Sequence, residues 1–236
     1  MAMTDTPHPQ LALHLSRKPN TDFASFYVGH NQQLVERLQQ VSRGDLSGWL
    51  YLWGAEQSGK SHLLQAACQQ AEDQGLSVFY LAGAEGRTLS PGLLDNLAAF
   101  QVLAIDDIHL LTTDPAWAEA LFHLYNKLKD LGSVLLVSSV SPPRQLPVGL
   151  ADLASRLMAM EVYQVVPMDD ADKAGALALM AQQRGFLLSD EVIAYILSRS
   201  DRTLRVLEGV VDRLDHQSLQ EKRVITIPFV KKVMSW

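Results

Sequence analysis

The sequence predicts an α/β protein in which a five-stranded parallel sheet lies between two layers of helices, with a small all-helical domain after it. Three observations predict this fold class. Strand-like and helix-like stretches alternate over residues 48–166, a glycine-rich loop follows the first strand, and strand patterns cease after Pro167. Such alternation produces parallel strands joined by right-handed crossovers, which build a doubly wound three-layer sandwich.

The overall composition is that of a folded protein with a sizeable core. Of the 236 residues, 47% are apolar, and Cys68 is the only cysteine, so a disulfide framework is excluded. No apolar run reaches the roughly 18 residues that a membrane span needs, and the first twenty residues lack the apolar segment of a secretory signal. The net charge of −6 argues against direct, sequence-specific DNA binding. We therefore expect a cytoplasmic protein with no membrane partner.

Residues 1–20 are polar and contain three prolines, which predicts a flexible N-terminal arm. Within the arm, Gln10 precedes leucines at every second position, Leu11, Leu13 and Leu15. An extended backbone presents these leucines on one side, which suits either a groove on another protein or an edge strand on the chain's own core. The pattern alone favours the edge strand.

An aromatic cluster at residues 23–29 precedes a helix expected over residues 31–41. The cluster lies just upstream of the first strand. Residues Tyr27, Val28 and Gly29 are therefore candidates to hold a nucleobase through backbone and apolar contacts, which discriminate weakly between bases. Ordinary packing between helix and sheet explains the cluster equally well.

The first strand, residues 48–53, runs into the pattern G-x-x-x-x-G-K-S at residues 54–61, and a helix is expected over residues 62–74. A buried strand before this pattern and a helix start after it are the context of a phosphate-binding loop. We expect Gly54 and Gly59 to take positive φ and turn backbone N–H groups inward.

The side chains of the loop complete a nucleotide site. Lys60 is expected to reach the terminal phosphates, and the hydroxyl of Ser61 is expected to bind Mg²⁺. The residues predicted to hold the phosphates of ADP or ATP are Gly54, Ser58, Gly59, Lys60, Ser61 and His62.

A second strand is expected at residues 78–82, and the third, at residues 102–106, ends in Asp106 and Asp107. Carboxylates at the tip of a buried strand are costly unless a positive charge is near, and Mg²⁺ on a phosphate chain supplies one. We expect Asp106 to hold the metal through water and Asp107 to polarise an attacking water. The alternative is a helix cap or a solvated turn.

The remaining elements continue the alternation and then end it. Strands are expected at residues 134–139 and 162–166, and helices at residues 93–100, 115–131 and 152–158. After Pro167, helices are expected at residues 169–184, 192–199, 203–219 and 228–236, with a short strand or turn at 224–227. We therefore divide the chain into an arm (1–20), a nucleotide-binding core (21–166) and a helical lid domain (167–236).

Four further stretches narrow the interpretation: FASF at residues 23–26, PPRQL at 142–146, DLASRL at 152–157 and TIPFVK at 226–231. Together with the phosphate loop and the acid pair, and in this order, they resemble the DnaA-related family of AAA+ proteins. The resemblance runs from the arm to the last residue. It is closest to the short Hda-like members, the DnaA regulatory inactivators, which lack the helix-turn-helix domain of full-length DnaA.

The resemblance implies roles for several residues. Arg156 resembles an arginine finger that reaches the nucleotide of a neighbouring subunit, and Arg205 resembles the lid arginine that contacts the phosphates. The peptide that starts at Gln10 resembles the segment with which Hda-like proteins bind the β sliding clamp of DNA polymerase III, which reverses the preference for an edge strand. One position departs from the family: Val140 stands where relatives place a polar residue that senses the γ-phosphate. Because Val140 cannot form that hydrogen bond, the contact is expected to be absent unless Ser139 or Ser141 supplies it.

The resemblance implies an AAA+ adaptor that binds nucleotide, docks on the clamp and stimulates hydrolysis of DnaA-bound ATP. Its partners would be DnaA and the clamp, with self-association as a homodimer or larger oligomer left open. Intrinsic ATP hydrolysis by the chain is expected to be weak. The alternatives are a stand-alone ATPase such as a helicase loader and, with less support, a small-molecule kinase.

Overall fold

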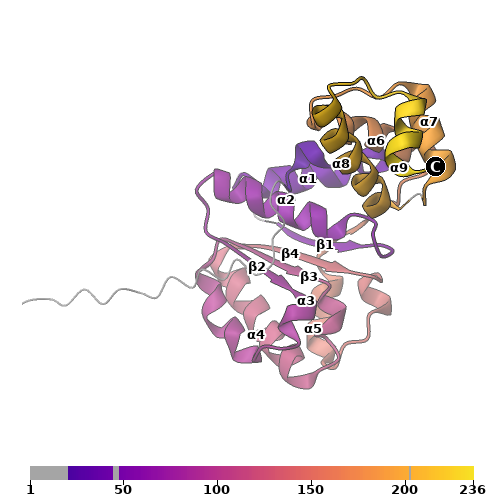
Figure 1. The fold of residues 1–236 in the computed structure, drawn as a ribbon. Coiled ribbons are helices and arrows are strands. Elements are labelled where there is room, and N and C mark those ends of the chain that lie inside the picture. Colours follow the sequence, from indigo (N-terminus) through magenta and orange to yellow (C-terminus); the bar gives the residue numbers. More distant parts are fainter. Residues whose placement is uncertain (1–20, 45–47, 202) are drawn as a thin grey trace, which may run out of the picture.

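The computed structural model describes residues 21–44, 48–201 and 203–236. The arm, with its Gln10 peptide, lies outside the described residues. Five parallel strands form one sheet in the order β2-β3-β4-β1-β5 (Figure 1). The strands are β1 (Trp49–Trp53), β2 (Val78–Ala82), β3 (Val102–Asp106), β4 (Val134–Ser139) and β5 (Glu161–Gln164).

Helices cover both faces of the sheet, which confirms the predicted three-layer sandwich (Figure 1). Helices α1 (Gln32–Ser42) and α2 (Lys60–Asp73) pack on one face, and α4 (Pro115–Leu131) and α5 (Ala151–Met158) on the other, while the short α3 (Gly83–Gly86) follows β2. Every residue of β3 and β4 is buried. Continuous apolar runs are typical of parallel strands with both faces covered, which explains why sequence patterns located these strands.

Local chemistry sets the ends of the longest core helix. Asp114 accepts hydrogen bonds from the backbone N–H groups of Ala116 and Trp117 at the start of α4, and Gly132, at φ +69°, ends it. Both are standard helix signals. The helix expected at residues 93–100 is instead a 3₁₀ segment, Pro91–Ala99, because its proline, glycine, aspartate and asparagine are poor α-helix formers.

The C-terminal segment consists of α6 (Asp170–Gln183), α7 (Asp190–Arg199), α8 (Leu204–Glu221) and α9 (Ile227–Met234). These helices enclose an apolar cluster of their own, which includes the fully buried side chains of Leu177, Ile196 and Val211. No strand forms at residues 224–227. Among the described residues, no helix is long and apolar enough to cross a membrane.

Two contacts hold the helical segment against the sheet-containing core, and a third fixes the chain just before that segment. The Asn31 amide exchanges two hydrogen bonds with the backbone of Val166, at 2.8 and 3.1 Å, so Val166 leaves the sheet and β5 ends two residues earlier than expected. The Gln183 amide donates to the Ala24 carbonyl at 2.8 Å. The ring of Tyr27 lies directly over Gly175 of α6. These contacts set the spacing between the core and the lid.

An ion pair ties α1 to the edge strand β5. Arg37 donates through Nε to Glu161 Oε2 at 2.9 Å and through Nη2 to Oε1 at 2.6 Å. These hydrogen bonds lower the pKa of Glu161 in the folded state, so the stabilisation is present above the ordinary value of 4.5 and is lost as the pH falls through the folded pKa. We expect Arg37→Met to reduce the free energy of unfolding by about 0.5–1 kcal/mol at pH 7 and by almost nothing in acid.

Urea unfolding at several pH values measures this difference. The matched control is Arg87→Met, since Arg87 is exposed and forms no ion pair with another described residue. A loss of stability that does not change with pH would show that the Arg37 side chain stabilises only by packing.

Candidate functional site

The loop between β1 and α2 depends on its two glycines for different reasons. Gly59, at φ +100°, caps α2 in the left-handed conformation, and a Cβ there would lie 2.8 Å from the Phe26 ring. Gly54 does not take the positive φ that we expected. A Cβ at Gly54 would lie 2.7 Å from the Val165 carbonyl oxygen, so glycine is required by close backbone approach, and Gln57 takes a positive φ of 62° instead.

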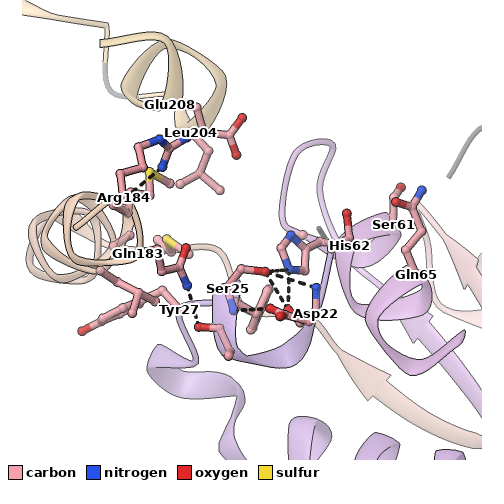
Figure 2. A pocket seen from close by; sticks show the side chains of 18 residues that line it. Asp22, Ser25, Tyr27, Ser61, His62, Gln65, Gln183, Arg184, Leu204 and Glu208 are labelled. Atoms are coloured by element: carbon pink, nitrogen blue, oxygen red, sulfur yellow. Dashed lines mark hydrogen bonds between the residues drawn. The ribbon is translucent and has the colours of Figure 1, made fainter. Parts of the chain in front are cut away.

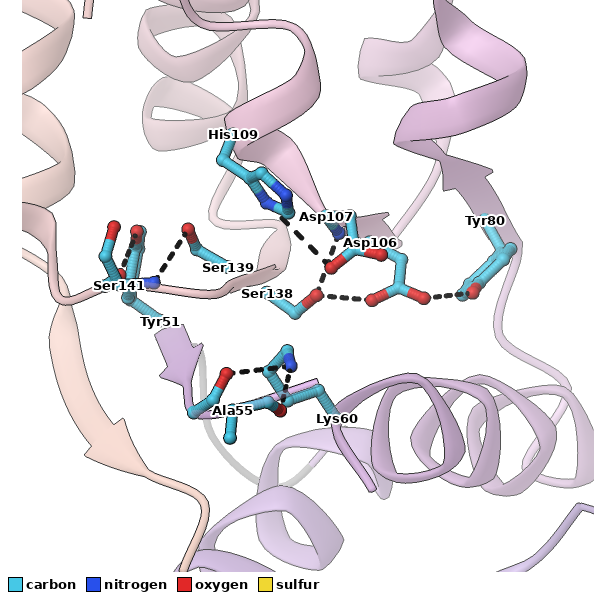
Figure 3. A network of polar contacts seen from close by, with 11 residues as sticks. Tyr51, Ala55, Lys60, Tyr80, Asp106, Asp107, His109, Ser138, Ser139 and Ser141 are labelled. Atoms are coloured by element: carbon cyan, nitrogen blue, oxygen red, sulfur yellow. Dashed lines mark hydrogen bonds and ion pairs between the residues drawn. The ribbon is translucent and has the colours of Figure 1, made fainter. Parts of the chain in front are cut away.

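Lys60 lies inside the curve of the loop and is only 5% exposed. Its ammonium donates to the carbonyls of Gly54 at 2.9 Å and Ala55 at 2.8 Å (Figure 3). Burial lowers the pKa of Lys60, and the charges of Asp107 and Asp106 oppose that shift. In the same loop, the hydroxyl of Ser58 is buried without a hydrogen-bond partner among the described residues. A buried ammonium and an unsatisfied hydroxyl in one loop fit a bound anion.

The acid pair at the end of β3 is held by side chains of two neighbouring strands. Asp106, 4% exposed, accepts a hydrogen bond from the Tyr80 hydroxyl at 2.7 Å and another from the Ser138 hydroxyl (Figure 3). The same Ser138 oxygen accepts from the backbone N–H of Asp107 at 2.8 Å. Both oxygens of Asp106 are therefore fixed, and burial together with this carboxylate raises the pKa of Tyr80.

The two acids differ in exposure. The side chain of Asp107 is 40% exposed, and its backbone adopts a positive φ of 51°. Burial, and next the charge of Asp106, raise its pKa, while His109 and Lys60 act in the opposite direction. The chemistry of the donors fits Mg²⁺, because the Ser61 hydroxyl and the carboxylates are hard oxygen ligands.

The turn after β4 contains Val140 and is held by hydrogen bonds of its backbone carbonyl groups. The Tyr51 hydroxyl donates to the Ser141 carbonyl at 2.9 Å, and the Gly54 N–H donates to the Ser139 carbonyl at 3.2 Å. Val140 itself is 39% exposed. The polar contact to the acid pair therefore comes from Ser138, two residues before Val140, and the backbone of Ser139 ties β4 to the start of the loop.

A cavity of about 670 Å³ lies between the loop and the helical segment (Figure 2). Volumes of this size are typical of small-molecule sites. Gly59 of the loop and Ser61 and His62 of α2 line one side, and a ring nitrogen of His62 lies 3.0 Å from the Asp22 carbonyl oxygen and 3.2 Å from the Ser25 hydroxyl. The opposite wall comes from α6 and the start of α8, including Gln183, Arg184, Leu204 and Glu208.

The aromatic cluster lies partly in the core and partly at the wall of the cavity. Phe26 is buried in the core and also lines the cavity, and Tyr27 lines the cavity beside it. Val28 packs against the core, and Gly29 starts a 3₁₀ turn beside Asp172, so neither lines the cavity. Arg205 does not line it either: the side chain lies in a separate hollow of the helical segment.

Arg156 lies on α5, which packs on the sheet face opposite α2. Its guanidinium carbon is 5.6 Å from the centroid of the Tyr125 ring, and it forms no ion pair with any residue in the described part of the chain. Burial raises the pKa of Tyr125, an effect that the Arg156 charge partly offsets. The structure therefore does not bring Arg156 to this chain's own acid pair, and it presents a guanidinium without a countercharge.

The close contact between Tyr27 and Gly175 makes the cavity sensitive to one position. A Cβ at Gly175 would lie 2.5 Å from the Tyr27 ring. We expect Gly175→Val to displace the ring and the lid, and to weaken ADP binding at least about 10-fold in calorimetric titration. Gly209→Val is the control, because a Cβ there meets nothing within 4 Å. Equal affinities in the two variants would contradict the role of this contact.

Comparisons with known proteins agree with this geometry. The model of the bacterial DnaA ATPase domain matches residues 18–161, which is more than half of the chain, and the model of the Hda lid domain matches residues 170–234. The two matches correspond to the sheet-containing core and to the helical segment.

Solved structures share the fold at low sequence identity. Domain III of the replication initiation protein DnaA from Thermotoga maritima is 22% identical, with a TM-score of 0.76 over 93% of this chain and 98% of that one. AMPPCP-bound DnaA from Aquifex aeolicus is 21% identical, with a TM-score of 0.70 over 83% of this chain and 65% of that one. The RuvB Holliday junction branch migration motor of Thermotoga maritima is 18% identical, with a TM-score of 0.65 over 88% and 68%. These likenesses establish an AAA+ fold with a helical lid.

Proposed function

Because the chain belongs to the family of bacterial DnaA ATPase domains, we propose that it is an adaptor that inactivates the initiator DnaA. In this proposal the chain binds adenine nucleotide, docks on the DNA-loaded sliding clamp and stimulates hydrolysis of the ATP held by DnaA. Conversion of DnaA to its ADP form prevents re-initiation of replication. The Hda-type lid supports an inactivator rather than an initiator.

The nucleotide site of the proposal consists of the loop and the cavity beside it. Backbone N–H groups of the loop, with Lys60, hold the phosphates, and the cavity between Tyr27 and α6 accommodates the nucleoside. AMPPCP in the Aquifex aeolicus DnaA structure supports adenine nucleotide as the ligand. Ser61 and Asp106 would hold Mg²⁺, which would neutralise phosphate charge, and Asp107 would orient water at the γ-phosphate. Bound nucleotide would also fix the angle between lid and core.

One observation carries the partner-directed part of the proposal: the guanidinium of Arg156 rests on the Tyr125 ring with no ion pair in the described part of the chain. It also lies across the sheet from α2 and the loop. An arginine held in this way can enter the nucleotide site of a second protein and stabilise the charge that develops during phosphoryl transfer. Arg156 therefore acts on the ATP of DnaA and not on the chain's own nucleotide.

The arm supplies the experiment that tests the proposed function as a whole. We expect the double variant Gln10→Ala and Leu11→Ala to lower affinity for the sliding clamp at least about 10-fold in surface plasmon resonance, because it removes the polar head and one apolar anchor of the peptide. Clamp-dependent hydrolysis of DnaA-bound ATP should fall in parallel.

Lys18→Ala is the matched control in the same arm, outside the Gln10 peptide. Undiminished clamp binding by the double variant would contradict the docking step. ATP turnover by the wild-type chain without DnaA, together with binding to a replicative helicase, would favour a helicase loader instead.

A further inference from the structure

A short turn at residues 22–25, which we call the wall turn, lines the nucleotide cavity between Gln183 of the lid and His62 of the core (Figure 2). Asp22 and Ser25 close the turn. The Ser25 N–H donates to Asp22 Oδ1 and the Ser25 hydroxyl donates to the Asp22 carbonyl, both at 2.8 Å. A single helical turn is too short to hold a fixed place by itself, so contacts with other elements decide where this wall lies.

His62 anchors the wall turn to the core. The ring nitrogen Nε2 lies 3.0 Å from the Asp22 carbonyl oxygen and 3.2 Å from the Ser25 hydroxyl oxygen. Because a carbonyl oxygen can only accept, Nε2 carries a hydrogen and donates it to Asp22. The His62 ring also packs beside the Phe26 ring, with centroids 5.5 Å apart, and Phe26 in turn lies over Gly59 of the loop. One side chain thus supplies a hydrogen bond to the turn and an aromatic contact to the residue that follows it.

The backbone and the ring of His62 belong to different parts of the site. The backbone lies in the first turn of α2, and the N-terminal end of a helix attracts phosphate groups. The half-buried ring is directed at the wall turn, as Figure 2 shows. The side chain is therefore placed to affect the nucleoside, and the backbone to affect the phosphates.

A second anchor reaches the same turn from the lid. The Gln183 amide of α6 donates to the Ala24 carbonyl at 2.8 Å. Tyr27, two residues after the turn, has its ring over Gly175 of the same helix. The wall turn is thus held from the core by His62 and from the lid by Gln183.

We propose that His62 is a positioning residue for the nucleoside: its ring holds residues 22–25 where this wall can contact the ribose and the base. The inference rests on the proposed nucleotide site and gives the His62 side chain a role that the phosphate-loop pattern does not contain. Phosphate groups meet the loop backbone and Lys60, whereas the nucleoside meets the wall turn and Tyr27. Loss of the His62 ring therefore weakens a nucleotide but not a ligand that consists of phosphate alone.

Calorimetric titration of the full chain with ADP and, separately, with pyrophosphate tests this division, with weak binding measured by displacement of ADP. We expect H62A to weaken ADP binding about 10-fold, because the hydrogen bond and the ring contact that place the wall are both lost. Affinity for pyrophosphate should stay within about 2-fold of wild type. H123A, at an exposed histidine of α4, is the matched control and should change neither affinity.

Two further substitutions of His62 separate the hydrogen bond from the packing of the ring. Glutamine can place an amide nitrogen close to the position of Nε2, so H62Q should recover ADP affinity to within about 3-fold of wild type. Phenylalanine keeps a ring beside Phe26 but has no donor, so H62F should bind ADP as weakly as H62A does. Melting temperatures of the nucleotide-free variants check that each of them folds.

The anchor on the lid provides an independent test. Q183A removes the hydrogen bond to the Ala24 carbonyl and should weaken ADP binding about 5-fold, again with pyrophosphate binding unchanged. Q182A is the matched control, because Gln182 is the exposed neighbour on α6 and does not line the cavity.

Three results would overturn the inference. Equal losses of ADP and pyrophosphate affinity in H62A would show that the side chain acts on the phosphate loop. ADP affinity within about 2-fold of wild type in H62A would show that the wall does not need this anchor. Wild-type ADP affinity in H62F would assign the effect to packing. None of these titrations contains clamp or DnaA, so their outcome is independent of the partner-directed part of the proposed function.

Discussion

Replacing Lys60 with alanine is expected to weaken ADP and ATP binding at least about 100-fold, the largest effect of any single change at the nucleotide site. The ammonium is buried at the centre of the loop and already donates to two loop carbonyls. Phosphate oxygens would replace those carbonyls as partners, and a charge-assisted hydrogen bond in a buried site is about twice as strong as a neutral one. Isothermal titration calorimetry with each nucleotide measures the loss.

The stability of the nucleotide-free protein is a second measurement on the Lys60→Ala variant. Because Lys60 also donates to the carbonyls of Gly54 and Ala55, its removal loosens the loop. The melting temperature of the nucleotide-free protein should therefore fall slightly. Lys127→Ala is the control, since this exposed lysine of α4 forms no ion pair with another described residue. Nucleotide affinity within about 3-fold of wild type in the Lys60→Ala chain would remove the phosphate role of the loop.

Replacing Arg156 with alanine is expected to lower clamp-dependent hydrolysis of DnaA-bound ATP about 1000-fold, the size of effect that arginine fingers have in phosphoryl transfer. The reason is positional: α5 lies on the sheet face opposite α2 and the loop, so in the proposed function the Arg156 guanidinium acts on the partner's nucleotide and not on the chain's own. Hydrolysis of radiolabelled ATP prebound to DnaA, in the presence of the chain and of DNA-loaded clamp, measures the rate.

Two further readouts separate a direct role of Arg156 from a structural one. Nucleotide binding by the variant chain and its affinity for the clamp should both be unchanged, because the loop and the arm are intact. Arg156→Lys should recover only a small part of the rate, since lysine keeps the charge but lacks the planar fork that matches phosphate oxygens. Arg144→Ala, at an exposed arginine before α5, is the control, and a full rate with Arg156→Ala would exclude the finger.

The predictions that succeeded depend on residues close together in the sequence. Strands β2, β3 and β4 have the predicted bounds, because continuous apolar runs between polar turns specify buried parallel strands. The helix that begins at Pro115 also has its predicted bounds, which Asp114 and Gly132 specify. The glycine-rich octapeptide at residues 54–61 lies between a strand and a helix as predicted, with Gly59 as the N-cap of α2.

The order of the strands in the sheet could not be predicted from the sequence. Tyr80 and Ser138 fix Asp106 only because β2 and β4 lie on either side of β3, an order that depends on how all five strands pack. A tyrosine inside the apolar strand β2 was only a weak indication that its hydroxyl donates to a buried carboxylate. The rotation of α8 likewise placed Arg205 in the separate hollow and Leu204 in the nucleotide cavity, a difference of one residue that helix packing decides.

The sequence by itself therefore determined the fold class, the place of the glycine-rich loop between β1 and α2, the acid pair at the end of β3 and the change to a helical segment after Pro167. The tertiary structure alone decided which side chains orient those acids, which sheet face carries Arg156 and which hollow receives Arg205. The physical reason is the range of the interactions. Turns, caps and periodic burial are set by residues a few positions apart, whereas contacts between strands and across helices arise only when the whole core has packed.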